Sequence, residues 1–261
     1  MSEELLKAII QLFAIVTRER ITEEERTDIK EFLALHLNRD AIKYYLNLFD
    51  EFANSYKTEE SSNSTETIDV ETQQFVDDWA KIMQITKKVN QALTMQQKQV
   101  LIVKIIELVS VDGDISERQS NLIFYIGQAL KIDQQDVKEL RDFVTGQDVD
   151  ELESRHILII DEGYEGRDGK AHPGPRIIEK NMTGLIAVLK LSETYFIKYL
   201  GISVIYLNSI PLRSRRIDVF PTGSTIRGDK IESIYYSDII GKFLVEESQS
   251  KITFTADHLF Y

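Results

Sequence analysis

The stretch Asp112-Gly113-Asp114-Ile115-Ser116-Glu117-Arg118-Gln119 joins two amphipathic segments of this 261-residue chain. A related stretch, Arg18-Glu19-Arg20-Ile21-Thr22-Glu23-Glu24-Glu25, lies 94 residues earlier. Each stretch follows a strongly apolar run, residues 100–109 in one case and 5–16 in the other. Each is followed by apolar residues at helical spacing: Ile123, Ile126 and Leu130 in one case, and Ile29, Phe32 and Leu33 in the other. This self-similarity predicts a duplicated helical unit whose halves bury their apolar faces against each other.

Three pairs of polar residues mark helix starts in this region. The pairs Thr22 with Glu25, Thr94 with Gln97, and Ser116 with Gln119 all have the spacing of a capping box. In a capping box the side chain of each residue bonds to the backbone N–H of the other. The pattern predicts that helices begin directly after Thr22, Thr94 and Ser116.

The segment from Val111 to Glu117, placed between two amphipathic helices, resembles the signature of the TerB-like (tellurite-resistance) helical domain. The resemblance covers roughly residues 1–150 and implies a pseudo-duplicated helical bundle. It also implies a divalent metal held by acidic residues near the loop, for which the candidates are Asp112, Asp114 and Glu117. Hard cations need several oxygen ligands that converge on one point.

A second interpretation of the same residues is structural. The loop lacks the acids of an EF-hand, and neither half has the complete acidic set, because Gln119 stands where the first half has Glu25. Asp112, Gly113 and Asp114 then form a turn, Ser116 caps the next helix and Glu117 interacts favourably with the helix dipole. Metal binding and capping both remain open at this point.

After Gly146 the helical spacing gives way to short β-branched or aromatic runs separated by turn residues. We predict a strand in each of six runs, at residues 156–160, 185–191, 195–200, 202–207, 216–220 and 239–244. The fold class is therefore α+β, with a duplicated helical bundle over residues 1–150 and a small antiparallel β sandwich over 151–250. The sandwich resembles forkhead-associated domains in the rhythm of Asn208 to Leu212, although the Ser-x-x-His of their phosphothreonine site is missing.

Two polar stretches and one basic patch complete this picture. Residues 54–71 contain almost no apolar residue, which predicts a flexible insert within the helical domain. Residues 161–175 carry four glycines and two prolines and predict a long mobile loop. Arg213, Arg215 and Arg216 form a basic patch that suits an acidic partner or phosphate, or is simply a solvated turn.

The segment from Ile252 through Phe254 to Tyr261 resembles the opening strand of an ABC-type ATPase domain. In that family an aromatic residue at the position of Tyr261 stacks on adenine. The resemblance implies that residues 251–261 begin an ATPase domain in a longer protein that uses ATP and magnesium. It also implies an ATPase and transmembrane domains of the same polypeptide as partners, homodimerisation through the ATPase and a place at the cytoplasmic face of the cell membrane.

The composition of the chain argues against several classes of function. Residues 1–150 hold 28 Asp and Glu against 17 Lys and Arg, and the net charge of the chain is −12, which disfavours nucleic acid. No run approaches the ~18 apolar residues of a membrane span, and the first residues lack a secretory-signal pattern, so we expect a cytoplasmic location. The chain lacks cysteine, which excludes thiol catalysis. Its four histidines, His36, His156, His172 and His258, lie in unrelated contexts, and we expect no enzyme activity.

The leading hypothesis is a noncatalytic regulatory or scaffolding region of an ABC transporter protein. One alternative is a free-standing TerB-like stress-response protein that binds a divalent metal. Another is an adaptor that binds phosphoproteins.

Overall fold

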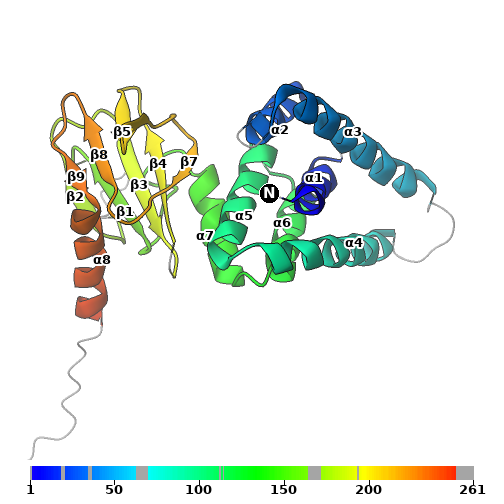
Figure 1. Ribbon diagram of the computed structural model, residues 1–261. Coiled ribbons are helices and arrows are strands. Elements are labelled where there is room, and N and C mark those ends of the chain that lie inside the picture. The colour runs from blue at the N-terminus through cyan, green and yellow to red at the C-terminus, as the bar shows by residue number, and fades with distance from the viewer. Residues whose placement is uncertain are drawn as a thin grey trace, which may run out of the picture. The chain divides into compact units, whose positions relative to one another are not determined.

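The computed structural model describes residues 2–18, 21–34, 37–62, 70–111, 113, 115–163, 172–192 and 194–250. The chain divides into two compact units, Met1–Arg141 and Asp142–Tyr261. This division lies earlier in the chain than the predicted boundary at residue 150. Figure 1 shows helices in the first unit and, in the second, strands followed by one further helix.

In the described residues, seven helices span the first unit and the start of the second. They are α1 (Glu3–Thr17), α2 (Glu23–Ala34), α3 (Arg39–Ser62), α4 (Val70–Ala92), α5 (Met95–Val109), α6 (Glu117–Ala129) and α7 (Gln134–Thr145). The last of these begins in the first unit and ends in the second.

Helix α1 is the central helix of the first unit. Eleven of its residues are buried, and it contacts α3, α4, α5 and α6 (Figure 1). A helix that is apolar on nearly all sides must be covered on nearly all sides. Phe13 illustrates this packing, because its ring lies edge-on to that of Phe32 in α2 at 5.3 Å. The apolar run over residues 5–16 therefore forms the core of the bundle, as its composition predicts.

Corresponding helices in the two halves of the bundle begin with similar capping residues. Ser2 caps α1 and Thr94 caps α5, Thr22 and Ser116 precede α2 and α6, and Asn38 and Asp133 bond to the first turns of α3 and α7. Helices α1 and α5 both have 15 residues, and α2 and α6 have 12 and 13. The three-helix order of the first half thus recurs in the second half, with α4 between them.

The expected flexible insert at 54–71 is largely helical in the described residues. Helix α3 continues to Ser62, and α4 begins at Val70, while residues 63–69 lie outside the described part. Buried Ala53 and Tyr56 extend the apolar face of α3 into this segment. Because that face keeps its helical spacing, the helix does not end where the polar composition begins.

The described strands of the second unit form two sheets. The first has the order β2-β1-β3-β4-β7 and the second the order β6-β5-β8-β9. Their bounds are β1 (Ile157–Asp161), β2 (Arg176–Ile178), β3 (Leu185–Lys190), β4 (Tyr195–Leu200), β5 (Ile205–Leu207), β6 (Ile210–Pro211), β7 (Ile217–Val219), β8 (Thr225–Gly228) and β9 (Ile234–Tyr235). Helix α8 (Tyr236–Ser250) follows β9 directly.

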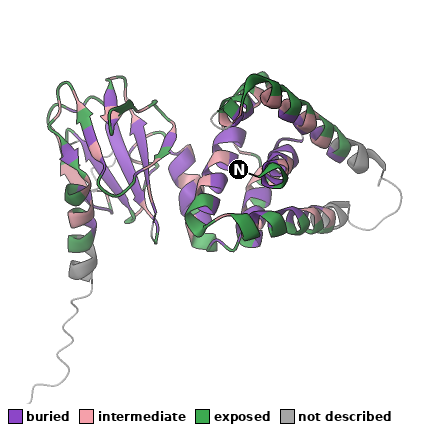
Figure 2. Cartoon of the chain, in the orientation of Figure 1, coloured by how far each residue is buried: buried purple, intermediate pink, exposed green. Residues whose placement is uncertain are grey.

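The two sheets share one hydrophobic core. Leu158, Ile186 and Ile197 of the first sheet cluster with Ile205 and Ile226 of the second. Figure 2 colours most of β1, β3 and β4 as buried, in agreement with the continuous burial along β1 and β3. The first sheet is therefore buried on both faces, because Ile159, Ala187 and Phe196 lie outside this core and are buried as well.

Two expectations about this unit are wrong. The first sheet is mixed and not antiparallel throughout, because β2 pairs with β1 in parallel. The connection over residues 162–175 is long enough to return the chain to the same end of the sheet, which a parallel pair requires. Residues 239–244, expected as a strand, lie within α8. Ile239 and Phe243 are four residues apart and both buried, so the helix places them on one face against the core.

The turn at Asn208 and Ser209 is present and connects β5 to β6. Both residues have positive φ, 50° and 69°, which suits the tight turn of a two-residue hairpin. The Asn208 side chain also accepts a hydrogen bond from the N–H of Thr225 at 3.0 Å, so the turn is tied to the start of β8.

Candidate functional site

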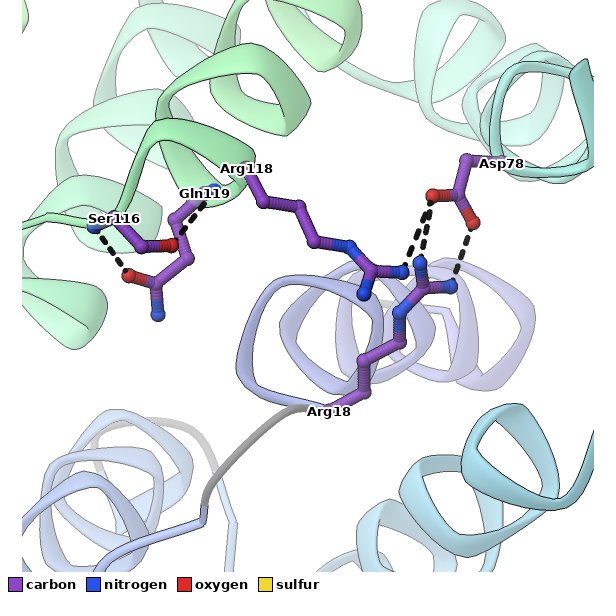
Figure 3. Close-up of polar contacts among 5 residues, drawn as sticks. All are labelled: Arg18, Asp78, Ser116, Arg118 and Gln119. Carbon is purple, nitrogen blue, oxygen red and sulfur yellow. Dashed lines mark hydrogen bonds and ion pairs between the residues drawn. The ribbon is translucent and has the colours of Figure 1, made fainter. Parts of the chain in front are cut away.

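The junction before α6 contains a complete capping box. The N–H of Gln119 donates to Oγ of Ser116 at 3.2 Å, and the N–H of Ser116 donates to Oε1 of Gln119 at 3.0 Å (Figure 3). Glu117 is exposed in the first turn of α6, where a negative charge stabilises the helix dipole. The structural interpretation of Ser116 and Gln119 is therefore confirmed.

Gly113 marks the turn before this cap. Its φ is +124°, a value that side-chain-bearing residues rarely adopt, and its N–H donates to the carbonyl of Ser110. Asp112 and Asp114, the two other candidate metal ligands, lie outside the described residues. Tyr261, the candidate adenine-stacking residue, also lies outside them.

The corresponding junction of the first half has its own capping box. The N–H of Glu25 donates to Oγ1 of Thr22 at 3.2 Å, and the N–H of Thr22 donates to Oε2 of Glu25 at 2.9 Å. Glu25 is 4% exposed. Its carboxylate therefore serves the helix start, as the capping pattern predicts.

A buried ion pair lies beside these two junctions. Nη1 and Nη2 of Arg18, at the end of α1, donate to Oδ1 and Oδ2 of Asp78 in α4 at 2.6 and 2.7 Å (Figure 3). The two side chains are 2% and 7% exposed. Two parallel bonds from one guanidinium fix both the distance and the orientation of the partner carboxylate.

Arg118 approaches the same carboxylate from α6. Its Nη2 atom lies 3.8 Å from Oδ2 of Asp78, and Figure 3 shows both guanidinium groups directed at Asp78. The first half, the second half and α4 thus meet through three charged side chains. Two guanidinium groups are thus directed at one carboxylate.

The bonds from Arg18 determine whether Asp78 is available to bind a metal ion. Both of its carboxylate oxygens accept hydrogen bonds from Arg18, so binding a divalent cation there would have to displace a buried guanidinium. Among the described residues, no three His, Asp or Glu side chains are placed to hold a metal ion. The cluster is built to join helices, and Asp78 is a structural partner of Arg18.

The described histidines are not brought together. His156 is exposed just before β1, which begins one residue later than predicted. Nδ1 of His172 accepts a bond from the N–H of Gly174 at 3.0 Å, and its Nε2 lies 2.8 Å from the carbonyl oxygen of Leu152. His36 and His258 lie outside the described residues.

Sequence reasoning missed several buried charged groups, of which Asp78 and Lys198 are two. Asp78 has no motif around it, because its partner Arg18 is 60 residues away. Lys198 in β4 is fully buried, and its Nζ donates to the carbonyl oxygens of Phe143, Val144 and Gly146 at 3.1, 2.6 and 2.6 Å. The alternation of β4 could have drawn attention to Lys198, which stands between Ile197 and Tyr199 in an otherwise apolar strand.

The comparison with known families agrees with the geometry of the helical unit. Residues 7–142 match the family described as tellurite resistance protein TerB. The match covers more than half of the chain, so this protein belongs to the TerB family. Searches of curated proteins and of solved structures found no match. Among the described helices, none is long and apolar enough to cross a membrane.

Proposed function

We propose that this TerB-family protein is a noncatalytic regulatory or scaffolding region that acts together with an ABC-type ATPase. The proposal of a noncatalytic role is supported by the hydrogen bonds of the polar side chains at the junction of the two halves. Arg18 and Asp78 bond to each other, and Thr22, Glu25, Ser116 and Gln119 are engaged in helix caps. These contacts hold helices in place, which is the requirement for a rigid platform.

The resemblance of residues 252–261 to the first strand of an ABC-type ATPase domain supports the link to ATP hydrolysis. In this proposal the ATPase and its transmembrane domains belong to the same polypeptide, and Tyr261 contributes only adenine stacking. ATP and magnesium belong to that domain and not to the units described above. The phosphates would be held by a phosphate-binding loop and its lysine, which supply most of the charge-assisted contacts.

The test is the coding sequence after the codon for Tyr261. The proposal expects the same reading frame to continue into a Gly-x-x-x-x-Gly-Lys-Ser/Thr loop. ATP hydrolysis by the extended protein should then change when residues 1–141 are deleted, whereas residues 1–261 alone should not bind ATP in calorimetry. A stop codon after Tyr261, or tight ATP binding by residues 1–261, would refute the proposal.

A second candidate is a TerB-family protein that binds a divalent metal through Asp112, Asp114 and Glu117. Family membership and the sharp turn at Gly113 favour it, since acidic residues on both sides of a turn can present oxygen atoms to one ion. Thermal melting with added metal separates it from the first proposal, as set out in the Discussion.

A further inference from the structure

The second sheet of the second unit, which we call the β unit, has an unusual composition on the face that points away from the core. Ile205, Leu207, Ile226 and Ile234 point into the shared core. Because successive side chains of a strand alternate between the two faces, Tyr206, Arg227 and Tyr235 lie on the opposite face of the sheet.

The strand register places these residues next to one another. Tyr206 of β5 lies directly opposite Arg227 of β8 on one side and Pro211 of β6 on the other. Thr225 of β8 lies opposite Tyr235 of β9. We name this set of five residues the Tyr206 face. Figure 1 shows β5, β8 and β9, the strands that carry most of it.

The Tyr206 face is accessible and continues into further apolar residues. Tyr235 is 51% exposed, and Val204, just before β5, is 55% exposed. Arg227 and Pro211 are also exposed, and Tyr206 is half-buried. The solvent side of an antiparallel sheet is normally polar, whereas tyrosine and arginine are enriched where proteins bind other proteins. The composition therefore fits a binding surface better than a simple solvated face.

The local charge indicates what kind of partner fits. From Val204 to Tyr235 the chain has five Lys or Arg residues against three Asp or Glu residues, in a protein whose totals are 31 and 43. Arg213 and Arg215, which follow β6, and Lys230, which follows β8, are exposed. This segment of the chain thus carries a net charge of +2, from 5 − 3, although the protein as a whole is negative. Complementary charge steers and orients an acidic partner toward such a face.

We propose that the Tyr206 face is a docking surface for an acidic polypeptide segment that also carries apolar side chains. The tyrosines and Pro211 contact the apolar side chains, and Arg227 pairs with a carboxylate of the segment. Single-stranded nucleic acid also uses aromatic and basic residues, but the net charge of −12 opposes binding to a phosphate backbone. This inference rests on the scaffolding role proposed above and names the type of partner for it.

The test uses the full chain and a fluorescein-labelled peptide composed of glutamate and leucine residues. Fluorescence anisotropy should show binding with a Kd of about 10–100 µM at low salt, and added NaCl should weaken it. Arg227→Glu should weaken binding by about tenfold or more, and Tyr206→Ser should weaken it to a similar degree. Lys180→Glu is the matched control, because it reverses an exposed charge in the loop between β2 and β3 and should leave binding unchanged.

Circular dichroism and melting curves of each variant establish that it is folded, and Arg227→Ala replaces Arg227→Glu if the charge reversal unfolds the unit. The proposal is overturned if the peptide does not bind, if Lys180→Glu weakens binding as much as Arg227→Glu, or if an oligothymidylate binds more tightly than the peptide. Failure here would remove the Tyr206 face as a docking surface. It would not decide the link to an ATPase, which the reading frame and the hydrolysis assay test separately.

Discussion

The carboxylate of Asp78 in α4 and the guanidinium of Arg18 at the end of α1 form a two-bond ion pair, with N–O distances of 2.6 and 2.7 Å, in the interior of the helical unit. Arg118 of α6 lies at the edge of the same pair. A buried pair of this kind is stabilising only while both partners are present, since either charge alone is strongly disfavoured in the interior. The pair therefore makes the positions of α1 and α4 depend on each other.

Replacing Arg18 with methionine should lower the free energy of unfolding by about 3–5 kcal/mol, because Asp78 is then a buried charge without its bidentate partner. The double variant Arg18→Met, Asp78→Leu should be more stable than Arg18→Met alone. Urea unfolding followed by tryptophan fluorescence is a suitable measurement, since the only tryptophan of the chain, Trp79, follows Asp78 in α4.

The matched control for this experiment is Arg26, which pairs with Asp50. Those side chains are 34% and 33% exposed, so Arg26→Met should cost less than about 1 kcal/mol. Equal losses for Arg18→Met and Arg26→Met would show that burial does not set the strength of the Arg18 pair.

Lys198→Met should destabilise the β unit by roughly 2–3 kcal/mol. The ammonium group satisfies three carbonyl oxygens at the end of α7, where the helix dipole favours a positive charge. Hydrogen exchange followed by mass spectrometry should show faster exchange in β4 and at the end of α7. The control is Lys190→Met in β3, a partly exposed position where we expect less than about 1 kcal/mol. Protection of β4 that is unchanged in Lys198→Met would contradict the structural role of this lysine.

Lys98→Met should raise stability at neutral pH. Burial lowers the pKa of Lys98, and repulsion from Lys131 lowers it further. Between this lowered pKa and the ordinary lysine value of about 10.4, the unfolded chain binds more protons than the folded chain. The free-energy cost of burying the charged ammonium group of Lys98 is therefore fully present at low pH, and it disappears as the pH rises through this window. Melting curves across alkaline pH should show the advantage of Lys98→Met shrinking, and an advantage that grows with pH would contradict this account.

Added calcium or zinc separates the two interpretations of the loop before α6. A metal that binds only the folded state raises the melting temperature by mass action. We expect little change, because Ser116 and Gln119 already account for the helix start. Ser116→Ala should lower stability by about 1 kcal/mol whether or not metal is present. A large metal-induced rise that Asp112→Ala abolishes would favour the metal-binding interpretation.

The elements that were predictable are those whose cause lies within a few residues. The capping boxes at Thr22, Thr94 and Ser116 join atoms three residues apart, so spacing alone reveals them. The apolar run of α1 is long enough for its burial to be inferred from composition. The strand over residues 195–200 was predicted with the bounds of β4, because its aromatic residues and Ile197 favour strand structure.

The elements that were missed depend on contacts across long stretches of chain. The run at residues 239–244 is too short to distinguish a strand from a helix, and only the core formed by both sheets selects the helix. The parallel pairing of β2 with β1 likewise follows from where the connection returns, which no local pattern specifies.

The sequence by itself determined where the helices of the bundle start, that the two halves repeat, and which segments are apolar enough to form a core, because these properties arise from neighbouring residues. Only the tertiary structure decided that Asp78 pairs with Arg18 and that the ammonium group of Lys198 binds the carbonyl oxygens at the C-terminus of α7. The reason is that the energy of a buried charge depends on which distant group is brought next to it.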